Sequence, residues 1–315
     1  MDAFELQKLA EHTRFMRETG IALLAASGIL AFFIFIPLAP AKTSSAEIVV
    51  TTSTVPDAFA QIPLEAKAAV VYDLVTKEVL YAKNADAQLP LASLTKLLTV
   101  YAALIELSPT TPITISANVT HLDEPRAFSA GQTFTLNDLA RLTLTASLND
   151  GAGAIAEAIA ERENRTQVEA LAGAAAALDL AQTYATNGHG LDVHLTVSGG
   201  YGSALDLARL AGALVDEAPV IAEATTQSFA HAVSKGGTSF KVANTDPMVT
   251  AIPHILLSKT GYTDLAGGNL ALVFDVGIGH PIAVVILGSS KKARFTDGTA
   301  LVAATLAHFA GVASL

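Results

Sequence analysis

The sequence predicts an α+β domain with an antiparallel sheet, and this prediction depends on the order of its segments. Two strand-like runs come first, a series of Ala-rich helices follows, and the pattern returns to strands before one last helix. A doubly wound sheet would instead alternate strands and helices along the chain. We expect the first and last segments to pack together on the sheet, with an all-helical subdomain beside it.

Local signals justify each element in chain order. Runs of strand-forming residues between turn formers indicate strands, and apolar residues at i, i+3 and i+4 indicate helices. Thr135 and Asp138 resemble a capping box for a helix that ends near Ala146. The predicted strands cover residues 68–74, 78–83, 239–243, 255–259, 269–276 and 281–287. The predicted helices cover residues 93–107, 135–146, 150–163, 166–180, 203–216 and 296–310.

The composition excludes several classes of protein. The chain has 315 residues and no cysteine, which rules out a disulfide scaffold and a thiolate metal site. A mean hydropathy of +0.45 is the opposite of what a disordered chain shows. A formal net charge of −10 argues against a nucleic-acid partner, since such binders are normally basic.

The N-terminal region predicts a membrane anchor. Residues 21–41 are apolar and uncharged, and a helix of this length covers about 30 Å, enough to cross a hydrocarbon core. Arg14 and Arg17 in the flank 1–20 favour a cytoplasmic N-terminus, so the rest would lie on the extracytoplasmic side. The alternative is a signal peptide cleaved after Ala39-Pro40-Ala41, which would release a secreted protein. We expect a Ser/Thr-rich tether at 42–63 and a single domain at 64–315.

The first motif with a chemical logic is Ser93-Leu94-Thr95-Lys96. Residues i and i+3 share one face of a helix, so the Lys96 amine can reach the Ser93 hydroxyl and take its proton. The backbone N–H of a serine at a helix start can also stabilise an oxyanion. The pattern alone is weak, because Ser289 and Lys292 match it too, but that copy follows a predicted strand instead of opening a helix.

Two further motifs strengthen the prediction. Ser147-Leu148-Asn149 falls at the junction of two predicted helices, where side chains can project into a cleft, whereas the similar Ser116-Ala117-Asn118 lies in a strand-like run. Lys259-Thr260-Gly261 ends the predicted strand 255–259. Its lysine and threonine can bind a carboxylate, and its glycine leaves room for a substrate backbone to approach.

These three motifs resemble those of the active-serine penicillin-recognising enzymes, SxxK, SxN and K(T/S)G. The surrounding residues resemble more narrowly the D-alanyl-D-alanine carboxypeptidases, the low-molecular-mass penicillin-binding proteins of serine peptidase family S11. The resemblance spans about residues 68 to 315, and its clearest stretches are AAVVYDLVTKEVLYAKNADAQLPLASLTKLLTV, LTLTASLNDGAGAIAEAIA and SKTGYTDLAGGNLALVF. It implies the fold shared by serine β-lactamases and penicillin-binding proteins.

The resemblance also implies roles for the motif residues. Ser93 would attack the carbonyl between the two terminal D-alanines of a peptidoglycan stem peptide, with Lys96 as the base. Ser147 would relay a proton to the leaving amine, and Asn149 would hold the substrate amide or position Lys96. The substrate side would be formed by Lys259, Thr260, Gly261 and Tyr262, the last supplying an oxyanion-hole N–H together with Ser93.

The same resemblance implies the partners of the protein. β-Lactam antibiotics would acylate the serine, and neither a metal nor an organic cofactor would be needed. Many relatives carry a β-rich C-terminal domain and a C-terminal amphipathic anchor, which we expect to be absent here, so that the N-terminal helix is the anchor. The Gly-rich segment 199–202 departs from the Ser-Thr-Ala run expected at that place.

Three alternatives remain at this point. A class A β-lactamase needs a glutamate before the third motif, and none lies between residues 185 and 203, while Glu169 falls inside a predicted helix. A catalytically inactive wall-binding protein would keep the cleft without the activity. A zinc peptidase would need His189 and His194 as ligands, but their five-residue spacing in a glycine-containing loop fits no helical ligand pair.

Overall fold

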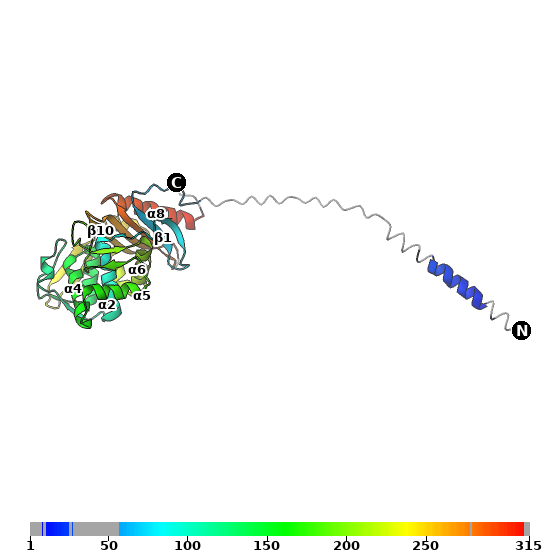
Figure 1. The fold of residues 1–315 in the computed structure, drawn as a ribbon, viewed down its shortest axis with the longest axis horizontal. Coiled ribbons are helices and arrows are strands. Elements are labelled where there is room, and N and C mark those ends of the chain that lie inside the picture. The colour runs from blue at the N-terminus through cyan, green and yellow to red at the C-terminus, as the bar shows by residue number, and fades with distance from the viewer. Residues whose placement is uncertain (1–7, 9–10, 25–26, 28–56, 278, 312–315) are drawn as a thin grey trace. The chain divides into compact units, whose positions relative to one another are not determined.

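The computed structural model describes residues 8, 11–24, 27, 57–277 and 279–311 (Figure 1). The chain divides into two units, residues 1–53 and 54–315. In the first unit, residues 11–24 are helical and exposed. Most of the predicted anchor, 21–41, and most of the predicted tether, 42–63, lie outside the described residues. Among the residues described, we find no helix with the length and apolar character needed to span a bilayer.

A five-stranded antiparallel sheet organises the second unit, in the order β10-β11-β12-β1-β2. Its central strand, the last in the chain, pairs with the first strand, with Ala68 opposite Leu287 and Asp73 opposite Ile282. This confirms the predicted α+β class and the predicted meeting of the first and last segments. The strands are β1 (Ala68–Asp73), β2 (Val79–Lys83), β10 (Ile255–Thr263), β11 (Gly267–Asp275) and β12 (Pro281–Ser289).

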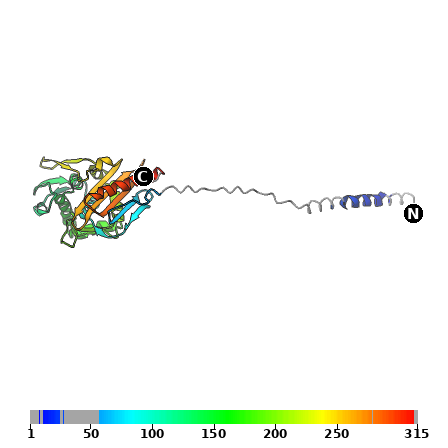
Figure 2. The ribbon, with the colours of Figure 1, turned by 90° about the horizontal axis from the view of Figure 1, so that it is seen from above.

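Helices cover both faces of this sheet. Ile282, Val284 and Ile286 of β12 point to one core, which they share with Leu301 of α8 (Ala293–Phe309). The residues between them on β12 point to the other core, where α2 and α6 pack. Figure 2 shows α8 lying across the strands on its own side of the sheet. An antiparallel sheet usually has one wet face, so its burial on both sides explains why β12 is apolar without alternation.

The remaining helices lie between β2 and β10 in the chain. They are α2 (Thr95–Glu106), α3 (Leu136–Ala146), α4 (Asn149–Glu163), α5 (Gln167–Ala177), α6 (Ala204–Glu217) and α7 (Pro219–Ala224). Five of these match predicted helices closely, and side-chain caps mark the starts of three of them, α3, α5 and α6. The Thr135 hydroxyl, for example, accepts the Asp138 N–H at 3.1 Å. The short helix α7 was not predicted, since six residues carry too little periodicity.

Short strands and 3-10 turns connect these elements. The strands are β3 (Leu89–Pro90), β4 (Pro112–Thr114), β5 (Thr133–Thr135), β6 (Tyr184–Ala185), β7 (Gly200–Gly202), β8 (Phe229–Val233) and β9 (Ser239–Ala243). The 3-10 turns are η1 (Ala92–Leu94), η2 (Val119–His121) and η3 (Val249–Ala251). Phe59 is buried against Tyr81 and His308, so packed chain begins before residue 64, the predicted start of the domain.

Candidate active site

The structure brings the three predicted motifs into one site. Ser93 and Lys96 come from η1 and the start of α2, Ser147 and Asn149 from the junction of α3 and α4, and Lys259 from β10. Two lysines join the groups: Lys96 Nζ lies 2.8 Å from Ser93 Oγ and 2.7 Å from Asn149 Oδ1, and Lys259 Nζ lies 2.9 Å from Ser147 Oγ. Side chains that are far apart in the chain therefore form one polar cluster.

The sequence predicted that Ser93 begins an α-helix. In the structure it lies in the 3-10 turn η1, directly before α2. Ala92, the residue before it, has a φ of 48°, a left-handed conformation that is uncommon for a residue with a side chain. Such strain persists only where the surroundings hold it. The turn presents the Ser93 hydroxyl toward Lys96, one turn further along the chain.

Lys96 is fully buried and has three partners. Its Nζ lies 2.8 Å from Ser93 Oγ, and it donates to Asn149 Oδ1 at 2.7 Å and to the backbone oxygen of His189 at 2.6 Å. Burial, followed by the nearby charge of Lys259, holds the pKa of Lys96 well below its usual range. The Asp150 carboxylate opposes this shift in part. A neutral amine within hydrogen-bond reach of a serine hydroxyl is the arrangement that activates the serine as a nucleophile.

Ser147 occupies the sharp turn between α3 and α4. It is the C-terminal cap of α3, with a φ of 59° in the left-handed region. This conformation turns its hydroxyl toward Lys259. Asn149 begins α4, and its amide lies between Lys96 on one side and the backbone oxygen of Asp123, 2.9 Å from Nδ2, on the other.

Lys259 and Thr260 lie inside β10 and not at its end. The strand was predicted to end at residue 259, yet pairing with β11 continues to Thr263. Lys259 is buried, and its Nζ also donates to the Thr260 backbone oxygen at 2.7 Å. Burial, with a smaller contribution from the charge of Arg294, lowers the pKa of Lys259 to about 7. The Thr260 hydroxyl lies 2.6 Å from that of Thr245.

Gly261 is required by a close approach that differs from the predicted one. A Cβ at this position would lie 2.9 Å from the Leu91 oxygen and 3.2 Å from the backbone nitrogens of Ser93 and Leu94. The missing side chain therefore lets β10 approach the serine-bearing turn. We predicted room for a substrate backbone, but the neighbouring atoms belong to η1. Gly200 acts similarly in the Gly-rich segment, since its Cβ would lie 2.2 Å from Thr95 Oγ1.

Sequence reasoning missed three residues of this site. Arg294 of α8 donates to the Gly261 oxygen, His189 supplies a backbone acceptor to Lys96, and Asp150 is a buried carboxylate next to Asn149. A backbone acceptor carries no residue signal, and Arg294 comes from an element far along the chain. Asp150 offered a weak signal, because a charged residue directly after the second motif falls at the buried start of a helix.

The competing residues lie elsewhere. Ser289 lies on β12 and donates to Asp297 at 2.7 Å, while Glu169 is exposed and forms the capping box of α5 with Thr166. Neither contacts the Ser93 cluster. In the described part of the chain, no group of three or more His, Asp or Glu side chains is placed to hold a metal ion, including the segment of His189 and His194.

Comparison with known proteins places this site in a family. The D-alanyl-D-alanine carboxypeptidase family, peptidase family S11, matches residues 52–291. The D-alanyl-D-alanine endopeptidase of Pseudomonas aeruginosa is 29% identical over 267 residues, which cover 82% of this chain and 84% of the relative. The D-alanyl-D-alanine carboxypeptidase DacF of Bacillus subtilis is 30% identical over 237 residues, covering 73% of this chain but 59% of the relative.

Solved structures agree with this placement. Penicillin-binding protein D2 of Listeria monocytogenes, in its cefotaxime-bound form, matches 77% of this chain and 98% of its own, with a TM-score of 0.64 and 27% identity. Penicillin-binding protein 6B of Escherichia coli matches 78% of this chain and 79% of its own, with a TM-score of 0.65 and 26% identity. The chain therefore belongs to the D-alanyl-D-alanine carboxypeptidases of peptidase family S11.

Proposed function

We propose that this protein removes the terminal D-alanine from peptidoglycan stem peptides, through an acyl-enzyme formed on Ser93. The observation that carries the proposal is the 2.8 Å contact between Ser93 Oγ and the buried Lys96 Nζ. Because the pKa of Lys96 lies well below its usual range, its neutral form, which can act as a base, is favoured. Family membership supports the same reaction.

The first step is acylation. The Lys96 amine takes the proton of Ser93, and Oγ attacks the carbonyl carbon of the penultimate D-alanine to give a tetrahedral oxyanion. The backbone N–H groups of Ser93 and Tyr262 stabilise this oxyanion, which forms beside the turn η1 and strand β10. The C–N bond then breaks, leaving an ester on Ser93 and a free D-alanine.

The leaving amine needs a proton. Ser147 Oγ, hydrogen-bonded to Lys259 Nζ at 2.9 Å, is placed to relay it, and the charge of Lys259 favours that transfer. Lys259 and Thr260 bind the terminal carboxylate of the substrate, since an ammonium and a hydroxyl suit that group. Water then hydrolyses the ester, which releases a stem peptide one residue shorter and regenerates Ser93.

β-Lactams should acylate the same serine. Two structures of the Listeria monocytogenes protein D2 are described as cefotaxime-bound and ampicillin-bound, at 27% and 25% identity to this chain. The two lysines, Ser147 and Ser93 provide here what a strained cyclic amide needs in order to open: a nucleophile, its base and a proton donor for the nitrogen.

The proposed location is the extracytoplasmic face of the cell membrane. The support comes from the sequence alone: the uncharged apolar run 21–41 follows Arg14 and Arg17, which favour a cytoplasmic N-terminus. Fractionation of cells that produce the full chain tests it. Recovery in the membrane pellet with residues beyond 57 open to external protease is the expected result, and a shortened protein in the medium would favour the signal-peptide alternative.

Incubation of purified protein with a pentapeptide ending in D-Ala-D-Ala tests the activity. One free D-alanine per product peptide that is one residue shorter is the expected result, and Ser93→Ala should abolish it. A folded protein that releases no D-alanine would favour the wall-binding alternative. Rapid turnover of a chromogenic cephalosporin would favour the β-lactamase instead.

A second substrate follows from the comparisons. Two relatives, from Pseudomonas aeruginosa and Escherichia coli, are named endopeptidases and align over 82% and 86% of this chain. The same acyl transfer would cut a cross-linked peptide if the leaving amine belonged to a second stem peptide. A cross-linked dimeric muropeptide, incubated beside the pentapeptide, separates the two activities by product mass.

A further inference from the structure

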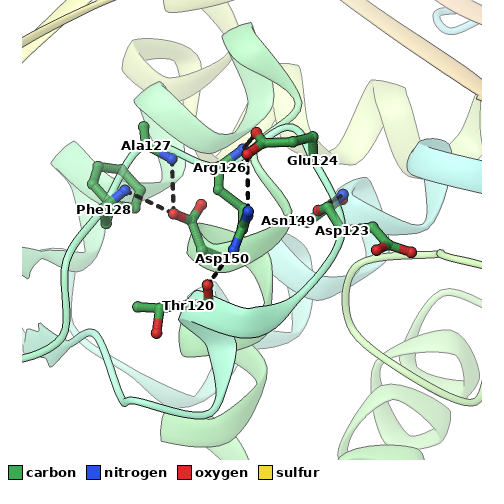
Figure 3. A network of polar contacts seen from close by, with 8 residues as sticks. All are labelled: Thr120, Asp123, Glu124, Arg126, Ala127, Phe128, Asn149 and Asp150. Atoms are coloured by element: carbon green, nitrogen blue, oxygen red, sulfur yellow. Dashed lines mark hydrogen bonds and ion pairs between the residues drawn. The ribbon is translucent and has the colours of Figure 1, made fainter.

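Asp150 is a buried carboxylate next to the active site that the reaction above does not use. It is 0% exposed and follows Asn149 at the start of α4. Its Oδ2 accepts the backbone N–H groups of Ala127 and Phe128, each at 2.8 Å (Figure 3). Its Oδ1 accepts the backbone N–H of Gly151 at 2.8 Å. A carboxylate is expensive to bury unless such bonds compensate it. Asp150 therefore binds the segment 123–128 to the helix that carries Asn149.

The segment 123–128 holds Asn149 in return. Asn149 Nδ2 donates to the backbone oxygen of Asp123 at 2.9 Å. The backbone N–H of Asn149 donates to the backbone oxygen of Pro125 at 2.8 Å. A peptide oxygen only accepts, so the amide nitrogen must face Asp123. The amide oxygen of Asn149 must then face the opposite way, toward Lys96.

This orientation decides where the lone pair of Lys96 points. A neutral amine has two N–H groups and one lone pair. The Asn149 Oδ1, at 2.7 Å, and the His189 oxygen, at 2.6 Å, accept the two N–H groups. The lone pair is left for the hydroxyl of Ser93, 2.8 Å away. A rotated Asn149 amide would present N–H groups to the amine, and Lys96 would lose one of the two acceptors that orient it.

We propose that Asp150 is a positioning residue for acylation: it fixes segment 123–128, which fixes the Asn149 amide, which aims the Lys96 lone pair at Ser93. The inference rests on the proposed function. The outer side of the segment is braced separately, because Arg126 donates to Glu124 Oε1 at 3.0 Å and to the backbone oxygen of Thr120 (Figure 3). Arg126 and Glu124 are exposed, so Arg126 can be substituted as a second and milder way to loosen the segment.

The charges around Lys96 make the pH dependence of acylation a second measurement, one that a loss of stability alone would not change. Lys259 of β10 lowers the pKa of Lys96, while Asp150 of α4 raises it. His189, in the segment between β6 and β7, has its own pKa lowered to about 4 by burial and then by the charge of Lys96. Removing the Asp150 charge should therefore lower the pKa of Lys96 further. The acid limb of the acylation rate should move to lower pH, while the maximal rate falls because the lone pair is no longer aimed.

The test uses the full chain and a fluorescent penicillin, with non-covalent affinity and acylation rate measured separately. For Asp150→Asn we expect the acylation rate constant to fall roughly 10- to 100-fold, as misplaced catalytic groups typically cause, with little change in affinity.

The matched control is Asp73→Asn. Asp73 is also buried and also accepts two successive backbone N–H groups, those of Val75 at 2.8 Å and Thr76 at 3.0 Å, but in the turn after β1. Its acylation rate should equal that of the unchanged protein.

The outcomes separate this inference from the proposed function. If the unchanged protein is not labelled, the proposed function fails, and this inference with it. If it is labelled and folded Asp150→Asn reacts equally fast, or if Asp73→Asn loses as much, the positioning role is overturned. If Asp150→Asn does not fold, the exposed Arg126→Ala decides: a several-fold slower acylation supports the proposal, and an unchanged rate contradicts it.

Discussion

Lys96 can act as a base because the fold removes it from water without giving it a counter-ion in direct contact. Its three partners are a hydroxyl, an amide oxygen and a peptide oxygen, all of them neutral. Together with the charge of Lys259, this environment lowers the pKa of Lys96 and so favours the neutral form, which carries a lone pair. The position of one buried amine therefore links the packing of the domain to its chemistry.

Replacing Lys96 by methionine tests this directly. Lys96→Met keeps most of the side-chain volume and removes only the base, so we expect acylation by a fluorescent penicillin to slow by about 10²- to 10⁴-fold. The exposed lysine of the β1–β2 turn provides the control, as Lys77→Met should react normally. A Lys96→Met rate within a few-fold of the unchanged protein would show that another group takes the serine proton.

The two lysines also predict a bell-shaped pH profile. Lys96 must be neutral to act as a base, so the rate is lost as pH falls through its lowered pKa. Lys259 must be charged to favour proton transfer and bind a carboxylate, so the rate is lost as pH rises through its pKa of about 7. In Lys259→Arg the cation persists, and we expect the alkaline limb to move well above pH 7. An alkaline limb that stays in place would assign it to another group.

At the scale of elements, the sequence predicted the helix boundaries that depend on local residues, and it missed the strand boundaries that depend on pairing with other strands. Caps and periodicity located α3 and α5, since Thr135 and Thr166 mark their starts within the chain itself. The extension of β10 from residue 259 to Thr263 depends on four further paired positions along β11, which no local pattern contains. The same holds for the site: motifs identified its side chains, but not the backbone and distant residues that orient them.

Gly261 tests how closely β10 must approach the serine-bearing turn. In Gly261→Ala the new Cβ would lie 2.9 Å from the Leu91 oxygen, so β10 or η1 must shift. We expect acylation to slow by roughly tenfold or more, because displacements of about 1 Å in a catalytic site have such effects. Gly173→Ala on α5 is the control, since its Cβ meets only the end of Arg165, at 3.4 Å. Normal acylation in Gly261→Ala would mean that the approach is not needed.

At the scale of the molecule, the mean hydropathy of +0.45 has several sources. The apolar N-terminal run and the Ala-rich helices can be read from the sequence. The structure adds a central antiparallel sheet buried on both faces, so that neighbouring residues of β11 and β12 belong to different cores. The strand β10, which carries Lys259 and Thr260, pairs with β11 in this sheet, so stability and activity share one framework.

Replacing Phe274 of β11 tests how much the buried sheet contributes to the free energy of unfolding. Phe274 is fully buried in the core beneath α8, and we expect Phe274→Ala to lower the free energy of unfolding by about 3–5 kcal/mol. Urea unfolding followed by circular dichroism gives this value. Val79 of β2 is 46% exposed, and Val79→Ala should change stability by no more than about 0.5 kcal/mol. Equal effects of the two substitutions would contradict the burial of the sheet face beneath α8.

The most direct test of the whole account is to locate the acyl group. After reaction of the full chain with benzylpenicillin, tryptic cleavage should release residues 84–96, whose only hydroxyl side chains are those of Ser93 and Thr95. We predict that this peptide carries the mass of one intact β-lactam, that fragmentation places it on Ser93, and that Ser93→Ala removes it. An adduct on any other peptide, such as the one carrying Ser147, would contradict the assignment of Ser93 as the nucleophile.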